Sequence, residues 1–175
     1  MMRILIWFLL LTGGLIAGPL LDMALFPNLF CSISFHLVSF VFGAILLRLV
    51  INGARNTGRQ LAHGGRVGDL PRMETNRLVT TGLYRCMRHP MHLALLFFPL
   101  ALALLEGSPS FIIIIWPMEV LFMLVMIRFV EEPEAKKKFG VDYTTYEKEV
   151  PMFSLSLSCL QELFLKRSKI SHPKK

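Results

Sequence analysis

Four stretches of the chain are strongly apolar, and the polar residues are gathered between them. The stretches are residues 4–21, 29–51, 91–105 and 109–130, of which the third is the shortest. An α-helix needs ~20 apolar residues to cross the hydrocarbon core of a bilayer. The pattern therefore predicts an all-α integral membrane protein with about four transmembrane helices in two hairpins.

The first stretch follows Arg3, as the apolar part of a signal peptide would. A cleaved signal peptide is therefore an alternative interpretation of residues 4–21. The stretch is longer than the ~7–15 residues of a typical signal-peptide core. Because three more apolar stretches follow it, we expect a retained helix.

Basic residues distinguish the two sides of the expected membrane. Residues 22–28 and 106–110 contain no lysine or arginine, whereas residues 52–90 contain seven arginines and the lysines lie in residues 131–175. Loops rich in lysine and arginine usually face the cytoplasm. We therefore expect both termini and the 52–90 connection on the cytoplasmic side.

The expected organisation has two parts. An N-terminal transmembrane hairpin covers residues 1–51, and a core covers residues 52–175. The core combines a cytoplasmic loop (52–90), a second transmembrane hairpin (91–130) and a cytoplasmic tail (131–175) with an interfacial helix. The first half of the loop holds five glycines (Gly53, Gly58, Gly64, Gly65 and Gly68) and is followed by Pro71, so we expect irregular chain, which in long loops is often functional.

Composition and charge narrow the class of protein. Hydrophobic residues make up 54% of the 175 residues and charged residues 18%, against ~45–50% and ~25% in soluble domains. This excludes a disordered protein, a coiled coil and most water-soluble enzymes. The net charge of +7 indicates a membrane-facing surface rather than nucleic-acid binding, because no nucleic-acid-binding motif is present.

The three cysteines, Cys31, Cys86 and Cys159, are far apart, so we expect no disulfide framework.

Residues 76–92 form the first polar cluster, directly before the third apolar stretch. They place Tyr84, Arg88 and His89 at the start of a helix, and Pro90 suits its first turn. A helix N-terminus favours an anionic group. Anchoring of arginine and tyrosine at the membrane interface is the alternative interpretation.

Residues 128–151 form the second cluster. Arg128 and Glu131 are three residues apart and share a helix face. Carboxylates at a helix C-terminus are disfavoured by the helix dipole, so Glu131 and Glu132 indicate either a binding pocket or an exposed ion pair. Further along, Phe139, Tyr143, Tyr146 and Val150 recur at helical spacing, which favours a packing stripe over ligand contact.

Together the clusters resemble the isoprenylcysteine carboxyl methyltransferase family and its phospholipid methyltransferase relatives. The resemblance covers roughly residues 76–153. It is carried by an ordered set of short motifs: Leu78-Val79-Thr80-Thr81-Gly82-Leu83-Tyr84-Arg85, Arg88-His89-Pro90-Met91, Glu131-Glu132, Phe139-Gly140, Tyr143, Tyr146 and Val150-Pro151.

The resemblance implies a small membrane enzyme that uses S-adenosylmethionine in a cytoplasmic pocket. No glycine-rich dinucleotide fingerprint is present, which agrees with that class. The implied catalytic residues are Arg128, which would bind the acceptor, and Glu132. The implied cofactor-binding residues are Asn76, Arg77, Leu78, Val79, Tyr84, Arg88, His89, Pro90, Met91, His92 and Glu131.

The chain departs from the family pattern at three positions. His92 stands where the family usually has tyrosine, Met152 stands where arginine commonly follows Val-Pro, and Ala135 replaces a common leucine. The first two departures bear on cofactor contacts and on anchoring of the helix.

The favoured function is methylation of the carboxylate of an isoprenylated cysteine or a similar lipophilic acid. A carboxylate with a pKa of ~3.5 is already ionised, so no general base is needed. N-methylation of a phospholipid amine is an alternative that requires a base such as Glu132 or His92. A non-catalytic membrane protein that keeps the scaffold is the third.

The expected partners are the lipid bilayer and a prenylated or other lipophilic acceptor, with no nucleic acid. The oligomeric state and the organism stay open. The membrane would be the endoplasmic reticulum in a eukaryote and the plasma membrane in a prokaryote.

Glu119 lies near the middle of the fourth stretch, where an acidic residue costs ~2.5–3.5 kcal/mol. Three interpretations are open: a hydrogen bond to His36 or Ser39, a hydrogen bond to carbonyls freed by Pro117, and a place beside the acceptor's access path. We favour the two structural interpretations.

Overall fold

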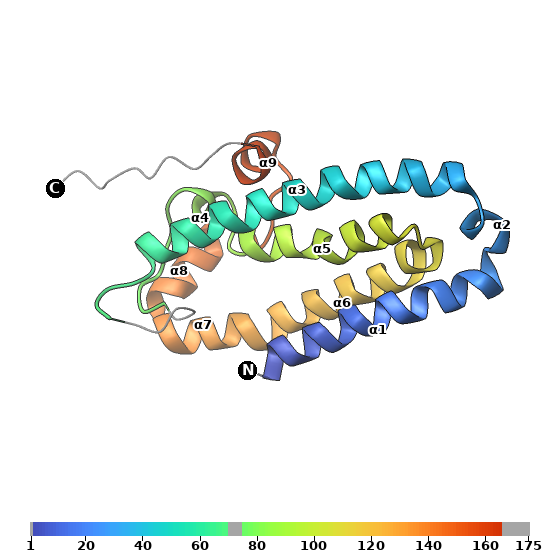
Figure 1. The fold of residues 1–175 in the computed structure, drawn as a ribbon. Helices are drawn as coiled ribbons and strands as arrows, with labels where there is room; N and C mark the ends of the chain where they lie inside the picture. The colour runs from blue at the N-terminus through green and yellow to red at the C-terminus, as the bar shows by residue number, and fades with distance from the viewer. Residues whose placement is uncertain (1, 70–74, 166–175) are drawn as a thin grey trace. The chain divides into compact units, whose positions relative to one another are not determined.

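The computed structural model describes residues 2–69 and 75–165. These residues form helices joined by turns and loops, which confirms the all-α prediction (Figure 1). The elements are α1 (Met2–Leu25), α2 (Pro27–Phe30), α3 (Ile33–Gly64), α4 (Leu83–Cys86), α5 (Pro90–Glu106), the π-helical turn η1 (Phe111–Ile115), α6 (Trp116–Met126), the π-helical turn η2 (Ile127–Glu131), α7 (Glu132–Phe139), α8 (Val141–Glu149) and α9 (Leu157–Phe164).

Three helical stretches among the described residues are long and apolar enough to cross a membrane. They are Leu5–Leu25, Ile33–Gly64 and Phe111–Phe139. The remaining expected span is α5, whose 17 residues fall short of the ~20 that a full crossing needs. Apolar side chains such as Phe8, Ile33 and Met118 are exposed on these stretches, as in a protein surrounded by lipid. The protein is thus a membrane protein, and its described residues contain three helices of full spanning length where four were expected.

The chain folds into two compact units, each built from two segments. Residues 1–48 and 96–127 form the first unit, and residues 49–95 and 128–175 form the second. The expected division into a hairpin of residues 1–51 and a core stays a prediction, as does the interfacial placement of α9.

The first unit is a helical bundle in which small residues permit close packing. Figure 1 shows α1 beside α6, where the rings of Trp7 and Phe122 meet with centroids 5.9 Å apart. A Cβ atom on Gly43 would lie 2.7 Å from the backbone nitrogen of Leu105, so only glycine allows α3 and α5 to approach this closely. The buried carboxylate of Asp22 accepts hydrogen bonds from the Ser108 hydroxyl and the Ser110 backbone N–H.

The second unit contains the part of the chain that was expected to be an irregular loop. That expectation is wrong for residues 52–64, because α3 continues to Gly64. Packing against α9 stabilises the extension. The Asn56 amide donates to the carbonyl oxygen of Leu163 over 2.9 Å, and Gly53 lies against Ala94 and Phe164.

Cys86 and Cys159 form a disulfide between the end of α4 and α9. The sequence predicted no disulfide framework, and the structure corrects this with one disulfide. The two cysteines are 73 residues apart in sequence, and their proximity arises from helix packing that sequence spacing does not reveal. Cys31 is free and exposed.

Glu119 is 5% exposed, and neither carboxylate oxygen has a hydrogen-bond partner among the described residues. The expected partners bond elsewhere: Nε2 of His36 lies 2.5 Å from the Phe30 carbonyl oxygen, and the Ser39 hydroxyl donates to the Leu104 carbonyl oxygen. Both structural interpretations of Glu119 are therefore wrong, since the carboxyl accepts or donates no such bond. A place beside an access path stays a prediction.

We expect Glu119→Gln to keep folding and activity, and Glu119→Leu to keep or raise the melting temperature. An apolar side chain removes a buried polar group that has no partner, and such a group costs ~1–3 kcal/mol. Thermal unfolding of the purified protein in detergent measures the effect. A fall in melting temperature for both variants would show that the carboxylate is needed.

Candidate functional site

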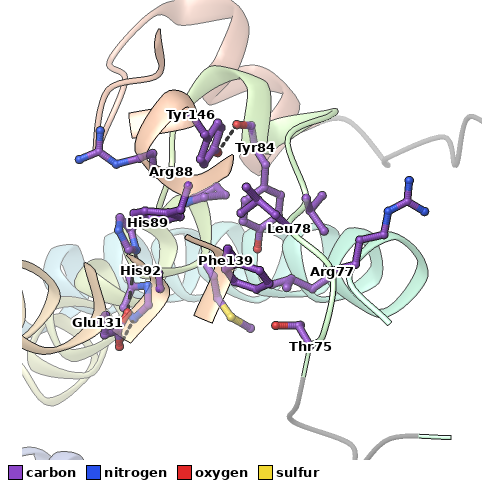
Figure 2. A pocket seen from close by; sticks show the side chains of 16 residues that line it. Thr75, Arg77, Leu78, Tyr84, Arg88, His89, His92, Glu131, Phe139 and Tyr146 are labelled. Carbon is purple, nitrogen blue, oxygen red and sulfur yellow. Dashed lines mark hydrogen bonds and ion pairs between the residues drawn. The ribbon is translucent and has the colours of Figure 1, made fainter. Parts of the chain in front are cut away.

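A cavity of about 240 Å³ lies within the second unit (Figure 2). Its volume is somewhat below the ~300–1,000 Å³ of pockets that enclose a small molecule. A ligand of that size therefore requires side chains to move or extends beyond the cavity. Figure 2 shows His89, His92 and Glu131 at one end and Thr75 and Arg77 at the other.

The loop that leads into α5 is shaped by glycine and by backbone pairing. Gly82 has φ +62°, a left-handed conformation that glycine adopts without strain. The next residue, Leu83, donates its backbone N–H to Oε1 of Gln60 over 2.9 Å. The backbone N–H groups of Arg88 and His89 donate to the carbonyl oxygens of Pro151 and Met152. The departure at Met152 therefore leaves this bond unaffected, because the bond uses the backbone.

A buried carboxylate, Glu132, is held between two arginines. It is 1% exposed. Oε1 accepts hydrogen bonds from Nε and Nη2 of Arg88, and Oε2 accepts one from Nη1 of Arg128 over 2.8 Å. Arg88 also donates to the carbonyl oxygens of Glu147 and Val150 over 3.0 and 2.7 Å. This arrangement fixes the loop before α5 to α7 and α8.

Two histidines and a glutamate, His89, His92 and Glu131, lie close together in the cavity. Nε2 of His92 lies 3.0 Å from Oε1 of Glu131. Nδ1 of His89 lies 3.9 Å from Oε2 of Glu131, and its Nε2 lies 3.7 Å from Oε1 of Glu132. Burial lowers the pKa of His89 to about 4, reinforced by the neighbouring His92 ring. The His89 imidazole is therefore neutral at physiological pH.

Three tyrosines, Tyr84, Tyr143 and Tyr146, also line the cavity. The Tyr146 hydroxyl donates to the backbone carbonyl of Tyr84, and the rings of Tyr143 and Tyr146 stack edge to face. Burial raises the pKa of all three phenols, that of Tyr143 to about 12. All three are protonated at neutral pH, and the hydroxyls of Tyr84 and Tyr143, which have no hydrogen-bond partner among the described residues, can donate to a ligand.

The structure brings most of the expected cofactor-binding residues together. All of them except Asn76 line the cavity: Arg77, Leu78, Val79, Tyr84, Arg88, His89, Pro90, Met91, His92 and Glu131. Asn76 instead bonds through its side-chain amide to the backbone N–H and carbonyl of Val67. The two expected catalytic residues, Arg128 and Glu132, lie beside the cavity without lining it.

Sequence reasoning missed part of the lining. Phe139, Tyr143 and Tyr146 were expected to form a packing stripe but line the cavity, as do Leu61, Thr75 and Ala135. The helical spacing of Phe139, Tyr143 and Tyr146 fits both a packing stripe and a cavity wall. A side chain in such a stripe can pack against the protein on one side and face the cavity on the other. No sequence pattern marks Leu61 as a lining residue, because it lies in the part of α3 that was expected to be an irregular loop.

The cavity offers both polar and apolar contacts to a ligand. The Tyr84 hydroxyl and Nε2 of His89 are buried without a hydrogen-bond partner among the described residues. Buried polar groups usually have partners, so these two atoms are suited to a ligand. The site thus combines an unpaired donor and an imidazole with a carboxylate, a guanidinium and apolar walls.

Comparison with known proteins agrees with this arrangement. The phospholipid methyltransferase family model matches residues 38–142. Protein-S-isoprenylcysteine O-methyltransferase B of Arabidopsis thaliana is 30% identical over 122 residues, which are 67% of this chain and 56% of the relative. The chain therefore matches only about half the length of that relative. No solved structure matches the chain. The resemblance seen in the sequence is confirmed, and the chain belongs to the phospholipid methyltransferase family of membrane methyltransferases.

Proposed function

We propose that the protein is an S-adenosylmethionine-dependent methyltransferase that methylates the carboxylate of an isoprenylated cysteine or a similar lipophilic acid. One observation carries the proposal: Tyr84, His89 and Glu131, which the family resemblance assigns to the cofactor, line one cavity. The name of the Arabidopsis thaliana relative supports the choice of acceptor.

The residues present suit this cofactor. Glu131 would accept hydrogen bonds from an ammonium group or from ribose hydroxyls, and the Tyr84 hydroxyl and His89 imidazole would use their unpaired buried atoms. Leu78 and Phe139 would pack against the adenine ring. When bound, S-adenosylmethionine supplies an electrophilic methyl group on a sulfonium.

Arg128 suits a carboxylate acceptor. Its side chain is 60% exposed, and one nitrogen, Nη1, bonds to Glu132. Nη1 also lies 3.7 Å from Oε1 of Glu147. The remaining N–H groups of the guanidinium can donate to a further carboxylate in the planar, bidentate geometry that arginine offers. Since the acceptor is already ionised, the protein has only to orient it and exclude water.

N-methylation of a phospholipid amine is the second candidate, because the matched family is named for it. An amine must lose a proton before it attacks. Glu132 is poorly placed to act as the base, since both its oxygens accept bonds from arginines. His92, hydrogen-bonded to Glu131, is the better candidate. A non-catalytic protein that keeps the scaffold is the third.

We also propose that the cavity opens to the cytoplasm. Residues 52–90 and 131–165, which hold most of the lysines and arginines, lie in the second unit, as does the cavity. Lysine and arginine are enriched on the cytoplasmic side of membrane proteins. A polar cofactor would then reach the cavity from the cytosol, while a lipophilic acceptor would arrive from the membrane.

Glu131→Ala should weaken S-adenosylmethionine binding more than tenfold, because a carboxylate that contacts the cofactor is lost. Isothermal titration of the purified protein in detergent measures the dissociation constant. Glu134→Ala is the matched control, since Glu134 is exposed on α7 and does not line the cavity. Equal affinities in wild type and Glu131→Ala would reject the assignment, and absence of wild-type binding would leave only the non-catalytic candidate.

The acceptor is tested with methyl-tritiated S-adenosylmethionine and protein in nanodiscs. One reaction contains a farnesylated cysteine analogue and the other phosphatidylethanolamine. A methyl ester releases labelled methanol on treatment with base, whereas an N-methyl group does not. We expect base-labile label on the farnesylated acid, and label confined to the amine lipid would select the second candidate.

Arg128→Lys should lower turnover of the acid acceptor at least tenfold and change cofactor affinity less than twofold. Lysine keeps the charge but lacks the planar fork. The same tritium assay and titration measure the two effects. Arg85→Lys, at an exposed position on α4, is the control. Normal turnover in Arg128→Lys would remove Arg128 from the site.

A further inference from the structure

Three potential metal ligands converge at one end of the cavity. His89 and His92 flank the first residues of α5, and Glu131 ends η2. One ligand atom from each residue lies within 4.8 Å of the other two, and all three residues line the cavity. Ligand atoms around a tetrahedral zinc ion, with bonds of ~2.0–2.1 Å, are ~3.3 Å apart. Small side-chain rotations would therefore bring the three groups into coordination.

We propose that His89, His92 and Glu131 bind a divalent transition-metal ion of the zinc class, with the fourth coordination position facing the cavity. Two imidazole nitrogens and one carboxylate form the donor set of zinc sites that keep one position open. Imidazole ligands select zinc and similar ions over magnesium and calcium, which prefer oxygen ligands. We therefore expect the site to bind zinc-class ions in preference to magnesium and calcium.

The Glu132 carboxylate next to the His89 ring supports the proposed metal site. Nδ1 of His89 faces Glu131 at 3.9 Å, and Nε2 faces Oε1 of Glu132 at 3.7 Å. Metal-binding histidines usually direct the second ring nitrogen toward a carboxylate or carbonyl, which fixes the ring. Glu132 is held in place by Arg88 and Arg128. When Nδ1 binds the metal, the N–H at Nε2 would point to Glu132.

The contact between His92 and Glu131 could alone be explained by a simple ion pair at 3.0 Å. That ion pair does not account for His89, whose side chain is 10% exposed and whose Nδ1 lies 3.9 Å from Oε2 of the same carboxylate. A metal uses both histidines.

Metal binding has a consequence that rests on the proposed function. His89 and Glu131 line the proposed cofactor site as well as the metal site. One carboxylate and one imidazole cannot coordinate a metal and hold the cofactor in the same way at once. The metal therefore weakens cofactor binding.

Zinc titration of the full-length, tag-free protein in detergent tests the site, after chelator treatment and removal of the chelator. We expect one zinc ion per chain and no binding of magnesium. His92→Tyr should weaken zinc binding at least tenfold. His63→Gln, at an exposed histidine of α3, should leave it unchanged. Circular dichroism checks folding, and Glu131→Gln serves as a second ligand variant if His92→Tyr does not fold.

The proposal is overturned if wild-type protein binds no zinc, if the ligand variants bind it as tightly as wild type, or if His63→Gln weakens it equally. Titration of S-adenosylmethionine with and without saturating zinc tests the consequence. Zinc binding without any cofactor binding would reject the proposed function and keep the metal site. Equal cofactor affinity with and without zinc would overturn the competition.

Discussion

The bond between Arg88 and Glu132 is the interaction on which the second unit depends. The two side chains are 8% and 1% exposed, so each charge is buried and relies on the other. Breaking a buried pair of this kind by removing one partner costs ~3–5 kcal/mol. Through its other N–H groups Arg88 also bonds to the backbone of Glu147 and Val150. One guanidinium thus joins the start of α5 to α7, to α8 and to the segment after α8.

The same pair determines which groups face the cavity. His89 follows Arg88 and Glu131 precedes Glu132 in the chain. When the arginine and the glutamate bond, their neighbours are brought within 3.9 Å of each other. The π-helical turn η2 helps to place Glu131, and such turns occur often at functional sites. The buried ion pair is therefore structural, while the adjacent histidine and glutamate line the cavity.

The sequence predicted those features that depend on local pattern. Long apolar stretches revealed the helices, and the polar motifs around Tyr84, His89 and Glu131 predicted most of the cavity. Features that depend on packing between distant segments were not predicted. Cys86 meets Cys159 because α4 packs beside α9, and α3 continues through Gly53 because Ala94 and Phe164 lie against that glycine. Asn76 was assigned to the ligand, but its amide stabilises the loop through Val67.

The proposed methyl donor would bind in the cavity of the second unit. Ultraviolet crosslinking of methyl-tritiated S-adenosylmethionine to the purified protein, followed by peptide mapping, tests it most directly. We expect label in residues 75–92 or 131–146, and we expect excess S-adenosylhomocysteine to abolish it. Label confined to residues 1–48 and 96–127, or label that the competitor does not displace, would contradict the account.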